Sequence, residues 1–493
     1  MFDWWLKDWI GLAAGNPEDI LRTGAMQNMT DLQFIEKETT NWLQCPKRMM
    51  QLKGNSYYRY EHDFDEVVDM AKDADGMPIQ KKRTKGRIIN NEYGDMVDQK
   101  VNYLLGKPFS LQTQNEDYTK LLSFVFDKEF KRMLNRVTVD CLNGGLSWVH
   151  PYFSPDGELL FKHFPGYQIL PFWADDDHTI LDAAIRYYCT YAYENLTEKT
   201  VHHVEVFTKD GIARFILENG KLTPDPDLPG TPYASGTDAA GNVVPAGWDK
   251  VPLVAFKYNA QEIPLIKRVI AIQDTLNKVW TNWSDAMTED VRDAVLVLRN
   301  YDGEDIADFR RKLMYYGAVK VSDEGGVDVL RIERDPSAYT TFLAEAKKAI
   351  VERSRGFDSK DDRMSSNPNE MNLRSMYSDI DLDADMMETQ YQAAFDQLLW
   401  FVDRYLIQAG KPDFTKEEVV FTFNRNIMVN DTDTIANIRN SEGLVSSETL
   451  LAHHPYVTDV QGELQKVAAE KQQNMDQYDT YRTGVGDGQS GTD

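Results

Sequence analysis

Cysteine is scarce in this chain of 493 residues: there are three, Cys45, Cys141 and Cys189, far apart in the sequence. An odd and sparse set does not form a disulfide framework, so we expect a reducing compartment. Long apolar runs are also missing, and none approaches the ~18 residues that a transmembrane helix needs. The start lacks a basic segment followed by an apolar run, which argues against a signal peptide.

The first residues are nevertheless rich in tryptophan. Trp4, Trp5 and Trp9 would suit a short amphipathic helix that touches a membrane. Asp3 and Asp8 suit an anionic membrane poorly, so we favour packing against the protein or a neighbouring subunit and expect no membrane partner.

Positive charge is in deficit, since the net charge is -25. A protein that grips DNA by its phosphates shows a basic face, so this balance argues against a tight, sequence-specific DNA binder. One basic cluster stands apart. It consists of Lys81, Lys82, Arg83, Lys85 and Arg87. A solvated loop is the simpler interpretation of this cluster, and contact with DNA or an acidic partner is the alternative.

Motifs that carry catalysis are missing as well. There is no G-x-x-x-x-G-K-[ST] loop, and neither H-E-x-x-H, C-x-x-C nor G-x-S-x-G occurs. The G-x-G-x-x-G pattern at residues 486–491 has no helix after it, so it lacks the geometry that cradles a phosphate. These gaps favour a protein that is not an enzyme and needs no cofactor.

Acidic residues imitate a metal site only in part. Asp379, Asp381 and Asp383 alternate as in a calcium-binding loop, but Ala384 stands where glycine is required and Gln390 where glutamate is required. The simpler interpretation is a solvated helix face.

Three other groups also have ordinary interpretations. The three aspartates at residues 175–177 resemble a loop charge run rather than a magnesium site. The adjacent pairs at residues 202–203 and 453–454 are histidines that cannot face one metal from a regular element. Cys141 has an apolar helical context, typical of a small buried residue. We therefore expect no metal site.

Length and composition indicate about three domains of an ordinary globular protein. Residues 16–150 are predicted to be mostly helical, with helices at residues 30–43, 95–105 and 117–143. Residues 146–262 are predicted to be rich in β-structure. The expected strands are residues 148–153, 158–161, 184–193, 203–207 and 213–217. Residues 219–249, rich in Gly, Pro and Asp, are predicted to form an exposed loop.

Helical periodicity returns at Pro264, and the spacing predicts a helix of about 25 residues. Its apolar stripe consists of Leu265, Val269, Ile272, Leu276, Val279, Trp283 and Met287. A small insert follows, with expected strands at residues 294–298, 318–321 and 327–330 and a helix at residues 303–316.

A second amphipathic helix begins at Pro336, and its stripe includes Phe342 and Ile350. After a polar loop at residues 358–369, a stripe without Gly or Pro runs to Gly410 and predicts one helix of about 40 residues. Average helices have about 11–12 residues. A strand at residues 419–423 and helical segments over residues 431–481 complete the prediction, and residues 483–493 are expected to be disordered.

Several segments in this order resemble portal proteins of long-tailed bacteriophages, particularly those of phages of Gram-positive hosts. The resemblance covers about residues 30–480. It rests on residues 97–108 (VDQKVNYLLGKP), on 143–148 (NGGLSW), on 164–165 (FP) with 169–171 (ILP), and on 251–256 (VPLVAF) with Asn259. Each segment alone is weak, and their joint order with the helix–insert–helix–loop–long-helix pattern is more specific.

The resemblance implies an α+β, portal-like fold. It has a wing of helices and small β-sheets, a helical stem, an α/β clip, a long kinked wing helix and a helical crown. The implied parts are a wing at residues 1–262 and 370–440, stem helices at 263–290 and 336–356, a clip at 291–335, a tunnel loop at 357–369 and a crown at 441–482.

The resemblance further implies a ring of about twelve copies at one capsid vertex of the virion, assembled in the host cytoplasm. Double-stranded DNA would pass through it without sequence specificity. Implied partners are the terminase large subunit, head-completion or adaptor proteins, and the major capsid and scaffolding proteins. The stem would pack through the two stripes above. DNA would face the tunnel-loop residues Asp358, Lys360, Asp361, Asp362 and Arg363, and clip docking would use Asp305, Arg310, Arg311 and Lys312.

Three alternatives remain open at this stage. Another phage head or tail-connector subunit would share the acidic, oligomeric profile. An enzyme built from scattered carboxylates would respond to metal or substrate. A peripheral membrane protein would depend on the N-terminal tryptophans.

Overall fold

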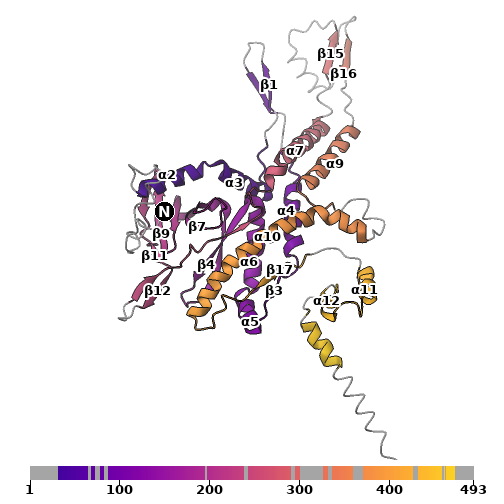
Figure 1. Ribbon diagram of the computed structural model, residues 1–493. Coiled ribbons are helices and arrows are strands. Elements are labelled where there is room, and N and C mark those ends of the chain that lie inside the picture. Colours follow the sequence, from indigo (N-terminus) through magenta and orange to yellow (C-terminus); the bar gives the residue numbers. More distant parts are fainter. Residues whose placement is uncertain are drawn as a thin grey trace, which may run out of the picture. The chain divides into compact units, whose positions relative to one another are not determined.

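Helices and sheets both build this chain, in agreement with the predicted α+β class (Figure 1). The computed structural model describes residues 31–64, 68–72, 78–82, 87–194, 197–237, 243–289, 295–299, 326–330, 336–358, 370–425, 431–452, 454–457, 460 and 462–471. The chain divides into a first unit, Met1–Gly356 with Asp383–Asn424, and a second unit, Phe357–Leu382 with Arg425–Asp493. Of the described helices, none is both long enough and apolar enough to cross a lipid bilayer.

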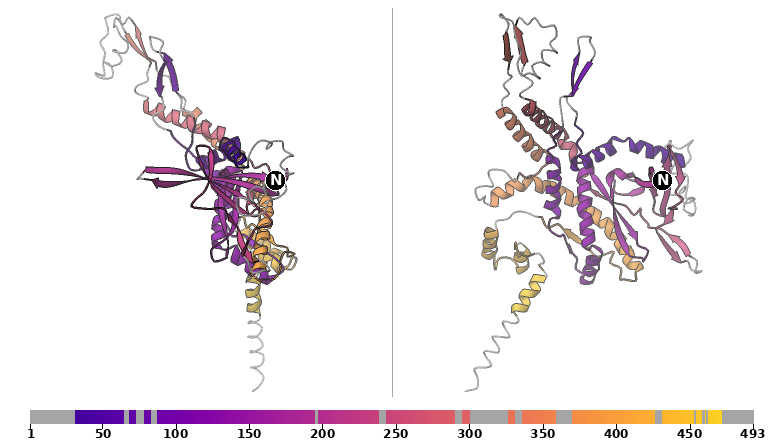
Figure 2. Two further views of the ribbon diagram at one scale, coloured as in Figure 1. Left: turned by 90° about the vertical axis from the view of Figure 1, so that its left-hand side faces the viewer. Right: turned by 180° about the vertical axis from the view of Figure 1, so that it is seen from behind.

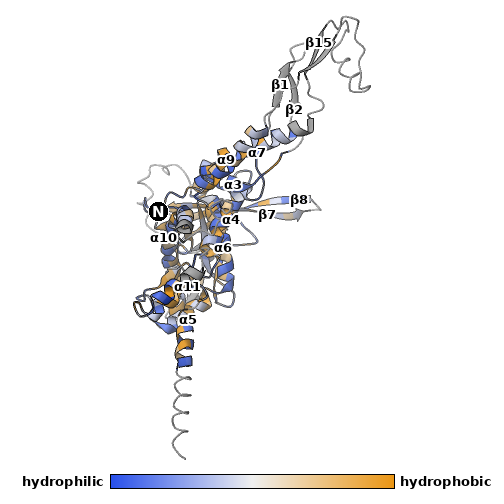
Figure 3. Cartoon of the chain, turned by 90° about the vertical axis from the view of Figure 1, so that its right-hand side faces the viewer, coloured by the Kyte–Doolittle hydropathy of each residue, from blue (hydrophilic) through white to orange (hydrophobic). Residues whose placement is uncertain are grey.

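The largest sheet of the first unit has the strand order β10-β9-β8-β7-β6, and the short β11 pairs with β9. Its strands are β6 (Ile169–Trp173), β7 (Leu181–Glu194), β8 (Thr197–Phe207), β9 (Gly211–Glu218), β10 (Lys221–Pro224) and β11 (Thr231–Pro232). Pairing of β7 with β8 continues to Glu194 and Thr197, beyond the ends of β6 and β9, so these two strands extend as a ribbon (Figures 2 and 3).

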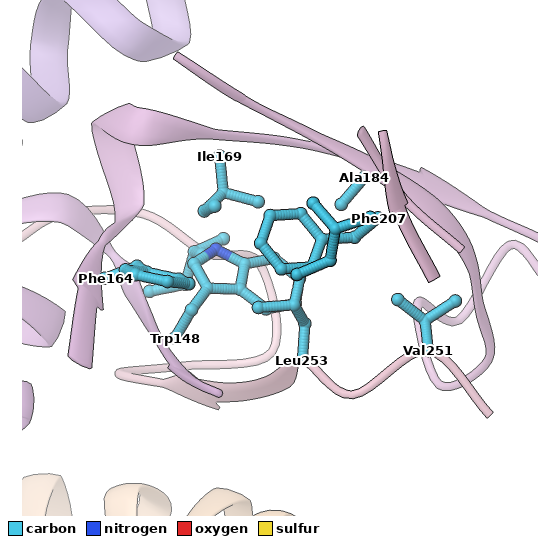
Figure 4. Packing of buried hydrophobic residues seen from close by; sticks show 9 residues of the cluster. Trp148, Phe164, Ile169, Ala184, Phe207, Val251 and Leu253 are labelled. Carbon is cyan, nitrogen blue, oxygen red and sulfur yellow. The ribbon is translucent and has the colours of Figure 1, made fainter. Parts of the chain in front are cut away.

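A smaller sheet packs against one face of the large sheet. It has the order β14-β4-β5 and consists of β4 (Leu146–Phe153), β5 (Leu159–Pro165) and β14 (Val254–Lys257). Apolar side chains from both sheets meet between them around Trp148, Phe164 and Phe207 (Figure 4). The predicted hairpin at residues 148–161 is confirmed, because β4 and β5 pair from Ser147 and Pro165 to Phe153 and Leu159.

The opposite face of the large sheet is covered by α2 (Asp31–Leu43). Ile35 of α2 packs against alternate residues of β7 and β8, including Ile185 and Val204. Alternation places Ala184 on the other face, in the core with Trp148. Period-two patterning therefore determines which residues face the helix and which face the second sheet.

Four further helices follow α2 in the first part of the chain, and each begins at a recognisable signal. They are α3 (Pro46–Tyr58), α4 (Glu92–Leu105), α5 (Glu116–Val125) and α6 (Lys128–Gly144). Proline begins α3, and the side chains of Asn91, Asn115 and Asp127 cap the other three. The prediction of one helix over residues 117–143 is wrong, because the helix is interrupted at Phe126. The Asp127 carboxylate then accepts a hydrogen bond from the Phe130 amide and begins a new helix.

Two other predictions need correction. The mostly helical segment contains a hairpin, β1 (Val68–Lys72) and β2 (Pro78–Lys82), so Lys81 and Lys82 of the basic cluster lie in a strand rather than a loop. The expected exposed loop at residues 219–249 contains β10, β11, β12 (Ala234–Thr237) and β13 (Val243–Ala246). Leu222 and Trp248 within it are buried, because apolar side chains in a Gly-rich segment still gain from leaving water.

The helix–insert–helix pattern is present as α7 (Ile266–Glu289), β15 (Val295–Arg299), β16 (Gly326–Leu330) and α9 (Pro336–Arg353). The strands β15 and β16 pair in antiparallel fashion. The insert helix expected at residues 303–316 and the strand at 318–321 lie outside the described residues.

The long helix is confirmed: α10 (Glu370–Gln408) has 39 residues. Its part within the first unit packs on α6 and the small sheet, where Tyr391 donates a hydrogen bond to Thr138 (2.9 Å) and Phe395 contacts Phe256. The strand β17 (Val420–Thr422) confirms the predicted strand and pairs with β3 (Ser110–Gln112).

The second unit contains the start of α10, α11 (Asp431–Asn440) and α12 (Ser447–Ala452). Phe357 and Tyr377 stack within it at 4.3 Å between ring centroids, and Arg425 pairs with Asp381 at 2.8 Å.

Candidate functional site

The helices α7 and α9 lie side by side and carry the apolar stripes predicted from the sequence (Figures 1 and 2). Three side chains of the predicted stripe are buried: Leu265, Val269 and Leu276. Three others are half-buried: Ile272, Val279 and Trp283. Trp283 contacts Tyr339 of α9, with 4.8 Å between ring centroids.

One residue of the predicted stripe on α9 is only partly covered inside the chain. Ile350 is buried, together with Leu343 and Ala346, but Phe342 is 40% exposed. At 100° per residue, the neighbouring Leu343 takes the inward position and Phe342 is turned away. Phe342 is therefore only partly covered within one chain, and its role in stem packing stays a prediction.

Beside its apolar stripe, α7 carries a buried polar stripe that the sequence analysis missed. Gln273, Asn277 and Thr281 recur every four residues and are almost fully buried. Their side-chain oxygens accept hydrogen bonds from the backbone amides of Tyr93 (3.0 Å), Asn90 (3.0 Å) and Ile88 (3.1 Å). The stripe thus binds the extended backbone that leads from the β1–β2 hairpin into α4.

A buried histidine completes this attachment. His62 Nδ1 accepts a hydrogen bond from the Asn277 amide (2.8 Å), and its Nε2 donates to the Tyr57 carbonyl (3.1 Å) and to Asn91 Oδ1 (3.2 Å). This pattern requires the neutral ring with the proton on Nε2. Burial lowers the pKa of His62, in keeping with a neutral ring.

A second buried site lies where α4, α7, α9 and α10 meet. We call it the Asp383 junction: Lys100, Tyr258, Arg268, Arg355 and Asp383. Lys100 Nζ (2.8 Å) and the Tyr258 hydroxyl (2.6 Å) donate to Asp383 Oδ2. Arg268 Nη1 (3.3 Å) and Arg355 Nη1 (3.6 Å) lie at Asp383 Oδ1.

This junction corrects the interpretation of the alternating aspartates as a solvated helix face for Asp383, whereas Asp379 is exposed as predicted. Asp383 is 1% exposed, because it turns inward from α10 toward Lys100, which is 3% exposed. Burial lowers the pKa of Lys100, the charge of Asp383 opposes that shift, and the nearby arginines add to it. A buried pair of this kind is costly to break, since either partner alone would be an uncompensated charge.

The end of α9 fits closely against α4 beside this junction. A Cβ atom on Gly356 would lie 2.5 Å from Met96 Sδ and 3.0 Å from Gln99 Oε1, so a larger residue there requires these two side chains to move. Lys100 also donates a hydrogen bond to the Arg355 carbonyl (3.0 Å). The chain therefore leaves the first unit at Gly356 and re-enters it at Asp383 through the same set of contacts.

A third charged site precedes α7. The carboxylate of Glu262 pairs with Lys47, with Lys257 (3.2 Å) and with His178 Nδ1 (2.9 Å). Burial acts to raise the pKa of Glu262, but the charge and hydrogen bond of Lys47 and the hydrogen bond from His178 outweigh it and lower the pKa to about 2.

Several other residues considered for chemistry have structural roles, and His453 lies outside the described residues. His202 contacts Tyr187 (2.7 Å), and His203 contacts Asp225 (3.2 Å), on opposite faces of β8, as expected for adjacent residues. Cys141 is buried, as predicted. Asp175 accepts hydrogen bonds within its own turn. Within the described part of the chain, no three His, Cys, Asp or Glu side chains gather as a metal site would require.

Few of the predicted DNA-facing and docking residues are among the residues that the structure describes. Asp358 is described and exposed. Lys360, Asp361, Asp362 and Arg363 of the loop, and Asp305, Arg310, Arg311 and Lys312 of the insert, lie outside the described residues. Their roles stay predictions.

A known protein family accounts for this architecture. The family described as phage portal protein, SPP1 Gp6-like, matches residues 46–477, which is most of the chain. The chain belongs to this family. Portal-family membership makes it a structural component of a bacteriophage virion and confirms the resemblance noted from the sequence.

Individual relatives agree with this assignment. The portal protein of Bacillus phage SPP1 is 27% identical over 455 residues, covering 90% of this chain and 87% of the relative. The portal protein of Clostridium phage phiCD119 is 24% identical over 431 residues, covering 84% of this chain and 91% of the relative. Both are from phages of Gram-positive hosts, the type predicted for this portal-family chain.

Among solved structures, a chain from the neck of an empty gene transfer agent particle, computed with C6 symmetry, aligns with a TM-score of 0.39 and 10% identity. The alignment covers 74% of this chain and 90% of that one.

Proposed function

We propose that about twelve copies of this chain form a ring at one capsid vertex, through which double-stranded DNA enters and leaves the head. The observation that carries the proposal is the portal-family match over residues 46–477. The α7–α9 helix pair, joined through β15 and β16 and followed by the long α10, supports it because such an elongated pair suits a channel wall better than an enzyme pocket.

The parts of the ring follow the order of elements. The wing is formed by residues 1–262 and 370–440, with both sheets. The stem is α7 and α9 within residues 263–290 and 336–356. Residues 291–335 form the clip, residues 357–369 the tunnel loop, and residues 441–482 the crown.

Contacts between copies are supported by apolar side chains left uncovered on the stem. Trp280 on α7 and Phe342 on α9 are 38% and 40% exposed in the single chain. Large aromatic side chains gain free energy when a neighbouring copy covers them. The stripe predicted to include Phe342 would then be completed by the next subunit.

The negative net charge of the chain suits a channel through which DNA passes without being held. Each copy carries a net charge of -25, and affinity for a polyanion comes from Lys and Arg. In the tunnel loop, Lys360 and Arg363 provide weak, sequence-independent phosphate contacts, offset by Asp358, Asp361 and Asp362. The clip residues Asp305, Arg310, Arg311 and Lys312 dock the terminase large subunit and later head-completion proteins, and the capsid and scaffolding proteins surround the ring during assembly in the host cytoplasm.

The proposal is tested by the mass of the purified protein, from size-exclusion chromatography with light scattering, and by negative-stain images. We expect rings of about a dozen subunits with a central hole. A stable dimer or tetramer without a hole would contradict the proposal. If the protein is monomeric, coexpression with capsid and scaffolding proteins from the same phage should yield rings, and failure there would also contradict it.

A further inference from the structure

The Asp383 junction contains more positive than negative charge. Lys100, Arg268 and Arg355 all contact Asp383, which is the one carboxylate of the described residues that pairs with them. Two positive charges of this cluster therefore have no negative partner inside it. This surplus is unusual in a chain whose net charge is -25.

The three cations differ in how far they reach the surface. Lys100 is 3% exposed, whereas the side chains of Arg268 and Arg355 are 26% and 45% exposed. A guanidinium has five N–H donors. Arg268 uses one donor on Asp383 (3.3 Å), and Arg355 directs one toward Met386 Sδ (3.9 Å). Further donors of both arginines are available toward solvent.

Asp383 fixes the place of these two groups. Its Oδ2 is occupied by Lys100 and Tyr258, and its Oδ1 lies within 3.6 Å of both guanidinium groups. The face of Tyr258 also lies 5.3 Å from the Arg268 guanidinium. The arginines are therefore held beside each other, which reduces the conformational entropy lost when they bind a common anion.

An anion of matching geometry would relieve the surplus charge. The charges of Arg268 and Arg355 contribute to the lowered pKa of Lys100, behind its burial, so added negative charge would favour all three ionised side chains. Two adjacent guanidinium groups suit the oxygens of a phosphate, which accept paired N–H donors.

We propose that Arg268 and Arg355 bind a backbone phosphate of duplex DNA, with Asp383 as the positioning residue that holds them. The inference rests on the proposed function, because a chain that lines a DNA channel meets this ligand. Arg355 lies two residues before residues 357–369, the proposed tunnel loop, so the contact would lie at the base of that loop in the sequence.

The test compares Arg355→Gln with Arg353→Gln, which removes an exposed arginine two residues earlier, in the last turn of α9. Each protein is assembled, its mass is checked, and its affinity for a labelled 30-base-pair duplex is measured by fluorescence anisotropy over a salt series. We expect Arg355→Gln to weaken binding about three- to tenfold and to reduce the salt slope by about one, the value for one lost phosphate contact. Arg353→Gln should match the wild type, and Arg355→Lys should restore most of the salt slope.

Each other outcome would overturn the inference. If Arg355→Gln behaves as Arg353→Gln does, Arg355 makes no DNA contact. If inorganic phosphate competes only weakly with DNA, and Arg355→Gln loses phosphate binding but keeps DNA binding, the site binds a free anion instead of DNA. If Arg355→Gln lowers the mass of the assembly, the missing anion is a carboxylate of a neighbouring copy. Wild-type rings that bind no DNA would reject this inference and leave the ring itself established, whereas absence of rings would reject the proposed function.

Discussion

The two sheets and the helix junctions of the first unit are held together by different forces. Between the sheets the contacts are apolar, around Trp148, Phe164 and Phe207. Where the helices meet, polar and charged groups are buried beside the apolar stripes, as in the α7 polar stripe and the Asp383 junction. Apolar packing depends mainly on buried area, whereas buried hydrogen bonds and ion pairs require particular partners at particular distances.

This difference has a consequence for how mutations act. An apolar core tolerates substitutions that keep its volume, but a buried charge whose partner is removed cannot be rescued by shape alone. We infer that the polar junctions fix the angles at which α7, α9 and α10 meet, while the sheet core supplies bulk stability. Four predictions test this contrast, beginning with the largest effect.

Asp383→Asn should destabilise the protein by about 3–5 kcal/mol, because it leaves the buried Lys100 without its charge partner. The free energy of unfolding is measured by urea titration. Asp379→Asn on the exposed side of the same helix is the control and should change stability by less than about 0.5 kcal/mol. Equal effects of the two variants would show that the junction has no special role.

Trp148→Ala should cost about 3–5 kcal/mol in the sheet core, through lost contacts and a cavity. Trp148→Phe should cost clearly less, because the indole N–H has no hydrogen-bond partner among the described residues and only volume is reduced. Thermal and urea unfolding of both variants decides this point. If Trp148→Phe is as damaging as Trp148→Ala, the core depends on more than packing.

Glu262 should make the free energy of unfolding depend on pH in the acid range. Its folded pKa of about 2 lies below the ordinary value of 4.5, so it contributes stability above pH 4.5 that is lost as the pH falls toward 2. The contribution is on the order of 2–3 kcal/mol. Unfolding measured from pH 6 to pH 2 should show a smaller loss in Glu262→Gln than in the wild type, and parallel curves would contradict the assignment.

Asn277→Ala should cost about 1–3 kcal/mol, because the Asn90 amide loses its buried acceptor and His62 loses its donor. Hydrogen exchange of residues 87–93 should accelerate as well. Thr275→Ala, an exposed position on the same helix, is the control and should leave exchange in that segment unchanged. Unaltered exchange in Asn277→Ala would show that the polar stripe does not hold this backbone.

Local signals were sufficient where neighbours in sequence decide structure. The stripe of α7, the length of α10 and the β4–β5 hairpin follow from periodicity and turn residues, and all three are present. The break between α5 and α6 was indicated in the sequence by Asp127, a favourable N-cap residue. The prediction missed it because it followed the continuous apolar periodicity of the segment. Phe342 shows the limit of a stripe, since a shift of one residue on a helix changes which side chain is buried.

By itself the sequence determined most of the long helices and several strands, because propensity, capping and periodicity act over a few residues. It also carried enough ordered segments to indicate the portal family. Only the tertiary structure decided that Asp383, of three alternating aspartates, is buried, because its partner Lys100 lies 283 residues away in the chain. The same holds for Gln273, Asn277 and Thr281, whose burial depends on a backbone about 180–190 residues away that no local pattern could supply.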